Sequence, residues 1–229
     1  PSISFTKQMH KRNIYYNASL TAETRQPDIT NLVGYVSHYD PLNTTIGNPD
    51  LKPQHTYKAA AYFVKNWPKW EQMLYTYLDA KVTQHQIMPS VSYDRMTGVY
   101  TRCDENTDGN WGSLAGVTFS RAIDKARRWR VENALWVTYT NMVWRGQDIF
   151  AQDAPMQRIT TRYIKFDDKL KLSFRASSKF DISANGGIVR GLSWSNLTSY
   201  QDVRITDFSY GIAAHWTLPL GFQLSSDLS

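Results

Sequence analysis

The sequence has 229 residues, enough for one large β domain or two small ones. Aromatic residues make up 14% of it, and the 14 Tyr and 8 Trp suit membrane interfaces and sugar-binding surfaces alike. Because Cys103 is the single cysteine, the sequence excludes an internal disulfide and a metal site built from several cysteine thiolates. The net charge of +6 comes from basic residues scattered along the chain rather than massed in one tail, so we expect no nucleic-acid partner.

Most of the chain is predicted to form long β-strands. β-Branched and aromatic residues dominate these segments, and apolar residues at helical spacing are rare. No apolar run is long enough for a transmembrane helix and no leader precedes the first strand, as expected of a segment excised from a longer chain or of a mature soluble protein. The predicted strands are 11–20, 55–66, 70–84, 111–122, 129–143, 162–177, 180–194, 204–218 and 221–229.

The connection between the first two predicted strands, 21–54, is rich in Asn, Asp, Thr and Pro. Near its end come Gly47, Asn48 and Pro49, then Leu51 and Pro53. A residue that precedes proline is pushed out of the helical region, so the chain is expected to take two extended, turn-like steps here, with Leu51 as a lone apolar anchor. We predict a rigid segment that fixes where the chain enters the next strand.

The connection 85–110 contains Cys103 and an acidic run behind it. Oxygen-bearing side chains at alternate positions, followed by a glycine for a sharp bend, are typical of the opening of a calcium-binding loop. The glutamate that closes an EF-hand would fall at Ala115, so that motif is not predicted, and the same residue types are ordinary turn formers. The candidate calcium ligands are Asp104, Asn106 and Asp108.

The later predicted strands give each face of the sheet one chemical character, because side chains alternate along a strand with a period of two. The strands 55–66 and 70–84 alternate less regularly, and their facing is not assigned. The basic face of 162–177 is expected to pair with carboxylates such as Glu132, Asp79 or Asp207, or to draw an anionic ligand inward. One face of this strand carries Leu170, Leu172, Phe174 and Ala176, and the other face carries Lys169, Lys171, Ser173 and Arg175.

The connections alternate between tight and long along the chain. The long ones are 21–54, 85–110, 144–161 and 195–203. Membrane barrels have this order because their periplasmic turns are short and their extracellular loops are long, and the strands are also long enough to cross the hydrocarbon layer. We therefore predict an all-β fold, an antiparallel up-and-down meander of long strands, in which residues 1–229 form a single segment of a transmembrane β-barrel in the cell outer membrane.

The prolyl segment resembles the G-N-P-x-L-x-P-E sequence of TonB-dependent outer-membrane receptors. The matching residues are Gly47, Asn48, Pro49, Leu51 and Pro53, and Gln54 stands where the family usually has Glu. Upstream, Thr24-Arg25-Gln26-Pro27 and Tyr39-Asp40-Pro41-Leu42-Asn43 are similar to the run found in the outer-membrane β-barrel branch of those receptors. The specific match covers about 21–66, and the rest of the chain resembles the family by its long strands with alternating tight and long connections.

The resemblance implies a barrel of about 22 strands that carries an N-terminal plug domain and is driven by TonB. The chain supplies about nine predicted strands and shows no plug domain and no TonB box, so we interpret it as an internal piece of the C-terminal half of the barrel. The expected partners are outer-membrane lipid, the rest of the parent barrel with its plug domain, TonB through the absent N-terminal part, and an extracellular small ligand of unknown identity.

No catalytic residue and no cofactor is predicted. The five histidines lie far apart with no ligand spacing, and no nucleophile elbow, phosphate-binding glycine loop or H-E-x-x-H sequence occurs. The leading hypothesis is a segment of a receptor that imports a scarce nutrient such as a metal chelate or a glycan. The alternatives are a soluble β-sandwich that binds carbohydrate and, less favoured, a barrel-embedded hydrolase.

Overall fold

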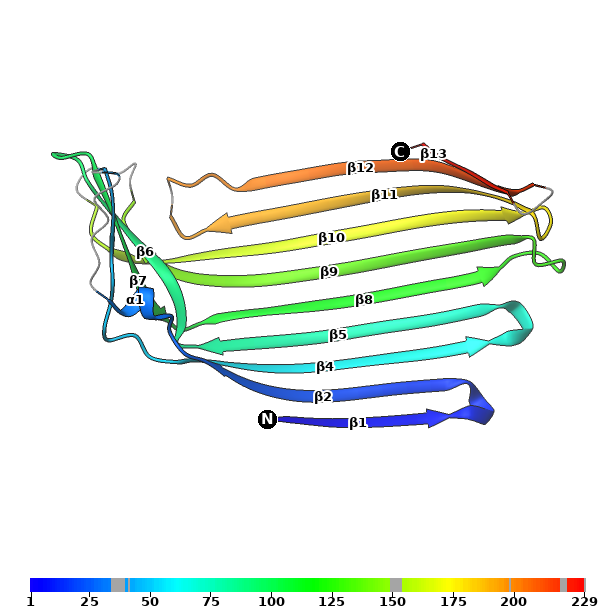
Figure 1. The fold of residues 1–229 in the computed structure, drawn as a ribbon, viewed down its shortest axis with the longest axis horizontal. Coiled ribbons are helices and arrows are strands. Elements are labelled where there is room, and N and C mark those ends of the chain that lie inside the picture. The colour runs from blue at the N-terminus through cyan, green and yellow to red at the C-terminus, as the bar shows by residue number, and fades with distance from the viewer. Residues whose placement is uncertain (34–39, 41, 149–153, 198, 219–221, 229) are drawn as a thin grey trace.

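The computed structural model describes residues 1–33, 40, 42–148, 154–197, 199–218 and 222–228 (Figure 1). The chain folds into one 13-stranded sheet. A short helix, α1 (Ile29–Leu32), and two 3-10 turns, η1 (His10–Arg12) and η2 (Pro68–Trp70), complete the described structure. The strands are β1 (Ser2–Met9), β2 (Ile14–Arg25), β3 (Asn43–Ile46), β4 (Gln54–Trp67), β5 (Gln72–Gln84), β6 (Gln86–Asp94), β7 (Val99–Thr107), β8 (Asn110–Ala122), β9 (Trp129–Gly146), β10 (Gln157–Arg175), β11 (Phe180–Ser195), β12 (Val203–Thr217) and β13 (Gln223–Leu228).

The sheet is an antiparallel meander, as predicted. Its strands lie in the order β1-β2-β4-β5-β8-β9-β10-β11-β12-β13, and each pairs antiparallel with its neighbours. We call the two ends of this wall the turn end, which carries η1, η2 and the other tight turns, and the loop end (Figure 1). At the loop end β6 and β7 form a hairpin beside the wall, and β3 pairs parallel with β7. Among the described strands, β1 and β13 each have one partner, so the sheet is open.

Three segments predicted to lie outside strands contain strands, and one of these is β3, which lies within the predicted connection 21–54. Residues 2–9 form β1, and their alternation of Ser with Ile and Phe was already a period-two signal in the sequence. The segment 85–110 was predicted as a long loop, but it contains the hairpin β6–β7. Its turn residues and Pro89 gave this segment a loop-like composition, whereas the hairpin is closed by the carboxylate of Asp94, which accepts hydrogen bonds from the amide of Met96 and the hydroxyl of Thr97.

The sheet forms a single layer. Within the described residues no second sheet or helical layer covers its apolar face, and no helix there is long and apolar enough to span a membrane. Large apolar side chains remain exposed on many strands, with Phe208 74% and Tyr210 81% accessible. A β-sandwich would bury those residues between two sheets, so the alternative of a soluble sandwich does not fit this fold.

The exposed apolar side chains form an oblique band across one face, which we call the outer face. On β1 the band comprises Ile3 and Phe5 and stops at Lys7. Paired residues on neighbouring strands form a row across the sheet that runs from Lys7 through Tyr16 and Val117 to Phe208 of β12. The apolar stretch ends at this row on β1 but begins at it on β12, so the band is oblique to the rows. Strands tilted with respect to a bilayer produce such an oblique band, because each strand enters the hydrocarbon layer at a different residue.

The height of the band also fits a bilayer. On β9 the apolar outer residues run from Trp129 to Tyr139. The ten steps from Trp129 to Tyr139, at a rise of about 3.3 Å each on a strand tilted by about 40°, cover roughly 25 Å along the membrane normal. This is the height of the apolar band in outer-membrane barrels. One polar pair interrupts the band, and it is internally satisfied because the amide nitrogen of Asn133 donates to a carboxylate oxygen of Asp168 over 2.6 Å.

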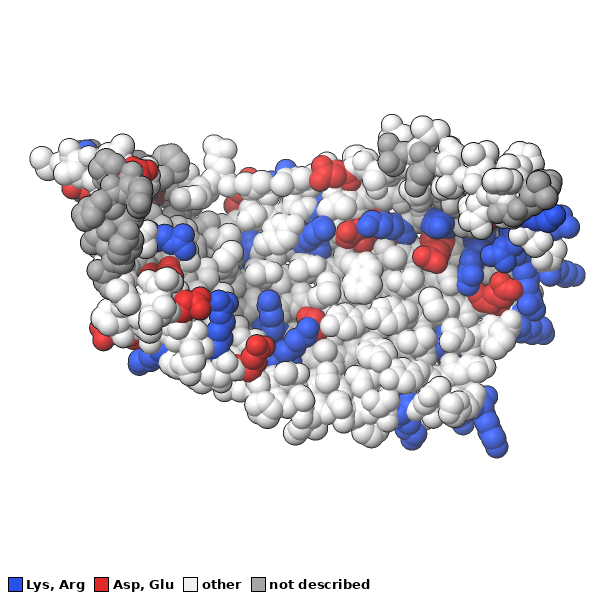
Figure 2. All heavy atoms as spheres, viewed as in Figure 1, with Lys and Arg blue, Asp and Glu red and all other residues white. Residues whose placement is uncertain are grey.

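The opposite face, which we call the inner face, is polar and charged, which resolves the facing of 55–66 and 70–84. Lys58 of β4 pairs with Asp79 of β5 at 3.2 Å. Lys169 pairs with Asp167 on its own strand at 3.8 Å, and not with the three carboxylates named from the sequence. In Figure 2, Lys and Arg gather at the right, where Figure 1 places the turn end.

Candidate functional site at the loop end

The prolyl segment 47–53 lies between β3 and β4, against the hairpin β6–β7. It begins where β3 leaves its parallel pairing with β7, at the pair Ile46–Cys103. Leu51, the predicted anchor, is only 8% exposed. The segment therefore buries its one large apolar side chain where the chain enters β4.

Side-chain amides fasten this segment to β7. The amide nitrogen of Asn48 donates to the carbonyl of Asp104 over 3.0 Å. Asn106 accepts the backbone N–H of Lys52 at 2.7 Å and donates to the carbonyls of Lys52 at 3.0 Å and of His85 at 2.7 Å. Asn106 thus satisfies backbone groups that no strand pairing reaches, and it joins three segments that are far apart in the sequence.

The structure brings two predicted features together, because Asn48 and Lys52 of the prolyl segment are hydrogen-bonded to two of the three candidate calcium ligands, Asp104 and Asn106. The third candidate, Asp108, bonds to His85 and Arg158 instead, and its carboxylate accepts the backbone N–H of His85 at 2.7 Å. Oδ1 of Asp104 lies 3.6 Å from the guanidinium of Arg102 and has no hydrogen-bond partner among the described residues. Within the described part of the chain, no group of three His, Cys, Asp or Glu residues could hold a metal ion. Calcium binding here stays a prediction.

A small polar cavity of about 140 Å³ lies between the end of β2, α1, the start of β4 and the hairpin β6–β7. Two ion pairs border it, Arg25 with Asp28 at 3.3 Å and Arg102 with Asp104 at 3.6 Å. Positive and negative side chains and several side-chain amides face this cavity, so it suits a polar group of a ligand. Its volume is below that of a pocket for a whole small molecule. Its lining residues are Arg25, Gln26, Asp28, Asn31, Gln54, Ile87, Pro89, Arg102 and Asp104.

Cys103 lies in β7 next to this cavity and is a free thiol, partly buried. Burial raises the pKa of the Cys103 thiol, and the negative charges of Glu105 and Asp104 raise it further. The thiolate is the reactive form of cysteine, so a raised pKa makes this residue a poor nucleophile. Cys103 was predicted to lie in a long connection, but it belongs to strand β7.

Sequence reasoning missed a contact between two histidines. His55 and His85 were treated as distant, but their ring centroids lie 6.3 Å apart at the junction of β4, β5 and β6. The ring of His55 also lies 2.9 Å from the hydroxyl of Thr24. His38 lies outside the described residues, His10 lies in η1 and His215 lies in β12. Only the cross-strand pairing of β4 with β5 reveals this contact.

An apolar outer face, a polar inner face and alternating tight and long connections define a membrane-spanning β-barrel wall. The family model described as the outer membrane protein beta-barrel family matches residues 1–223. The chain therefore belongs to this family, and its location is the outer membrane. No curated protein matches the chain.

Proposed function

We propose that the chain forms part of the wall and extracellular loops of a TonB-dependent receptor that imports a scarce nutrient, either a metal chelate or a glycan. The observation that carries the proposal is the prolyl segment 47–53. It has the receptor-like sequence, it stands directly before a wall strand, and the side chains of Asn48 and Asn106 fasten it to β7. The proposal includes no catalytic step.

The loop end supports a role in ligand capture. Its polar cavity has paired charges of both signs and amide groups, which suit the oxygen-rich surface of a chelate or a sugar. The inner face continues this polar character into the barrel wall, where Lys58, Asp79 and Tyr77 form one hydrogen-bonded group. A ligand released from the loop end would therefore meet a polar path rather than an apolar one.

TonB dependence is tested by binding, because this test needs no knowledge of the ligand. The full-length protein, purified in detergent, is passed over the immobilised periplasmic domain of TonB from the same organism. We expect saturable binding that a peptide copy of the receptor's N-terminal region abolishes. Absence of binding would remove the TonB-dependent part of the proposal and leave a barrel wall of another class.

The nutrient class is tested by uptake. Cells with and without the gene receive radiolabelled iron as ferric citrate, or maltoheptaose as the only carbon source. Uptake of one of the two should require the gene and should stop when a protonophore collapses the energy supply. The variant Asn106→Ala should lower this uptake and leave TonB binding unchanged, since it loosens the loop end and not the barrel. Uptake that continues in de-energised cells would contradict the proposal.

A further inference from the structure

We propose that the outer face of β1, β2, β4 and β5 binds one anionic phospholipid, with an acyl chain in a groove floored by alanine and the phosphate in a basic cleft at the turn end. This inference depends on the membrane location of the wall and not on TonB or on any imported ligand.

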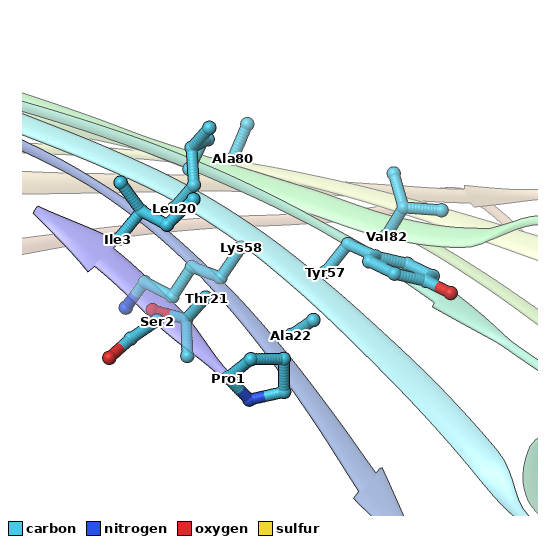
Figure 3. Close-up of a pocket in the computed structure, with 11 residues that line it drawn as sticks. Pro1, Ser2, Ile3, Leu20, Thr21, Ala22, Tyr57, Lys58, Ala80 and Val82 are labelled. Atoms are coloured by element: carbon cyan, nitrogen blue, oxygen red, sulfur yellow. The ribbon is translucent and has the colours of Figure 1, made fainter.

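The groove follows β4 on the outer face. Its floor consists of small side chains, Ala59 and Ala61 of β4 with Ala18 of β2 and Ala80 of β5. Two adjoining cavities of about 480 and 440 Å³ lie over this floor. Figure 3 shows the first of these cavities, where Ile3 and Leu20 lie side by side.

The groove is a local feature of the outer face. Its walls are large apolar residues: Phe5 and Leu20 on one side, Leu78 on the other. On β9 and β10 the corresponding rows carry large residues such as Tyr139 and Phe166, which leave no comparable floor of alanine. A strip of methyl groups between taller side chains matches the width and the chemistry of a hydrocarbon chain.

A third cavity, of about 470 Å³, lies at the turn end of the same strands and is the basic cleft. Three cations line it, Arg12 of η1, Lys65 of β4 and Lys69 of η2, and none of its lining residues is acidic. The ammonium of Lys65 lies 4.8 Å from the ring centroid of Trp67. Within the described part of the chain these three cations form no ion pair, since the nearby Glu71 is paired with Arg127 at 3.5 Å.

The cleft and the groove are spaced as a headgroup and a chain are spaced in one leaflet. Lys65, Ala61 and Ala59 share the outer face of β4, because their positions differ by even numbers. Ala61 lies about 13 Å along the strand from Lys65 and Ala59 about 20 Å, at about 3.3 Å per residue. Half of a bilayer's hydrocarbon core is roughly 15 Å thick, so a lipid with its phosphate at Lys65 places its chain over the alanines.

Charge complementarity identifies the occupant. Three unpaired cations beside an aromatic ring at the membrane interface recognise an anionic phosphate, and a zwitterionic lipid would leave part of this charge without a partner. The turn end as a whole is rich in Lys and Arg (Figure 2), so a specific site must be distinguished from general attraction by the charged rim.

The test measures lipid selectivity by electron spin resonance. Full-length protein is reconstituted into phosphatidylcholine bilayers with spin-labelled phosphatidylglycerol or phosphatidylcholine, and the immobilised fraction of each label is compared. We expect the wild type to prefer phosphatidylglycerol by about fivefold or more, as a site with several cations should. The triple variant Arg12→Gln/Lys65→Gln/Lys69→Gln should lose this preference.

The matched control is Lys125→Gln/Arg128→Gln/Lys179→Gln, which removes the same charge from other turns at the turn end and should keep the preference. The variant Ala59→Leu/Ala61→Leu fills the groove, leaves all charges in place, and should lower the preference at least twofold. Absence of a preference in the wild type, an equal loss in both triple variants, or an unchanged preference after the groove is filled would each overturn the proposal.

Discussion

Gly116 of β8 and Trp136 of β9 are neighbours on the inner face of the sheet, and the indole ring of Trp136 occupies the space where a side chain at position 116 would lie. A Cβ atom built on Gly116 would clash with the ring, and the two residues are direct partners in the pairing of β8 with β9. The ring packs in turn near Tyr75 and Tyr77 of β5, so this glycine allows an aromatic cluster on the inner face.

We predict that Gly116→Val displaces this ring and destabilises the wall by about 1–3 kcal/mol, the usual cost of overpacking. The measurement is the urea concentration at which the heat-modifiable gel shift is lost. Gly186→Ala is the matched control, because the nearest atom to a Cβ there, the carbonyl oxygen of Ser209, is 3.9 Å away. Equal midpoints for the two variants would show that the ring is not held over Gly116.

The facing of the later strands could be predicted from the sequence, whereas the facing of 55–66 and 70–84 and the arrangement of the loop end could not. Leu170, Leu172 and Phe174 share the outer face as predicted, because the period of two is a local property of the backbone. The contact of Asn106 with Lys52 spans 54 residues and exists only because the hairpin β6–β7 folds beside the prolyl segment. No local pattern encodes such a contact, so the motif and the acidic run were recognised separately but not as neighbours.

Removal of the Asn106 side chain should loosen the prolyl segment without unfolding the wall. In Asn106→Ala the backbone groups of Lys52 lose both of their side-chain partners. Loss of these bonds should cost about 1–2 kcal/mol locally, and hydrogen exchange at the Lys52 amide should become about tenfold faster. Hydrogen exchange followed by mass spectrometry of peptides over 47–53 measures the change.

The control for this experiment is Asn17→Ala, which removes a hydrogen bond to Thr6 between β1 and β2. It should leave exchange in 47–53 as in the wild type. If Asn106→Ala also left exchange there unchanged, the segment would be held by its prolines and Leu51 alone.

The turn between β8 and β9 should weaken in acid. The carboxylate of Asp124 accepts the backbone N–H of Trp129 at 2.8 Å, and this hydrogen bond lowers the pKa of Asp124. A carboxyl group whose pKa is lower in the folded than in the unfolded state contributes stability above the unfolded pKa of about 3.9, and this contribution is lost as the pH falls through the folded pKa. Exchange at the Trp129 amide, corrected for its intrinsic pH dependence, should therefore accelerate below about pH 4. Asp124→Asn should remove this acid dependence, and a dependence that survives in the variant would assign it to another group.

The orientation of the wall is tested with single cysteines in a Cys103→Ala background. Met96 lies at the turn of the hairpin β6–β7 and is 97% exposed, whereas Lys69 lies in η2 at the turn end. Because long loops face the exterior in outer-membrane barrels, a maleimide on a large polyethylene glycol should modify Met96→Cys in intact cells, and Lys69→Cys only after the outer membrane is permeabilised. The native Cys103 should react more slowly than Met96→Cys at pH 7, since burial raises the pKa of its thiol and lowers the fraction of thiolate. Modification of Lys69→Cys in intact cells, with Met96→Cys protected, would reverse the orientation and would place the polar cavity on the periplasmic side.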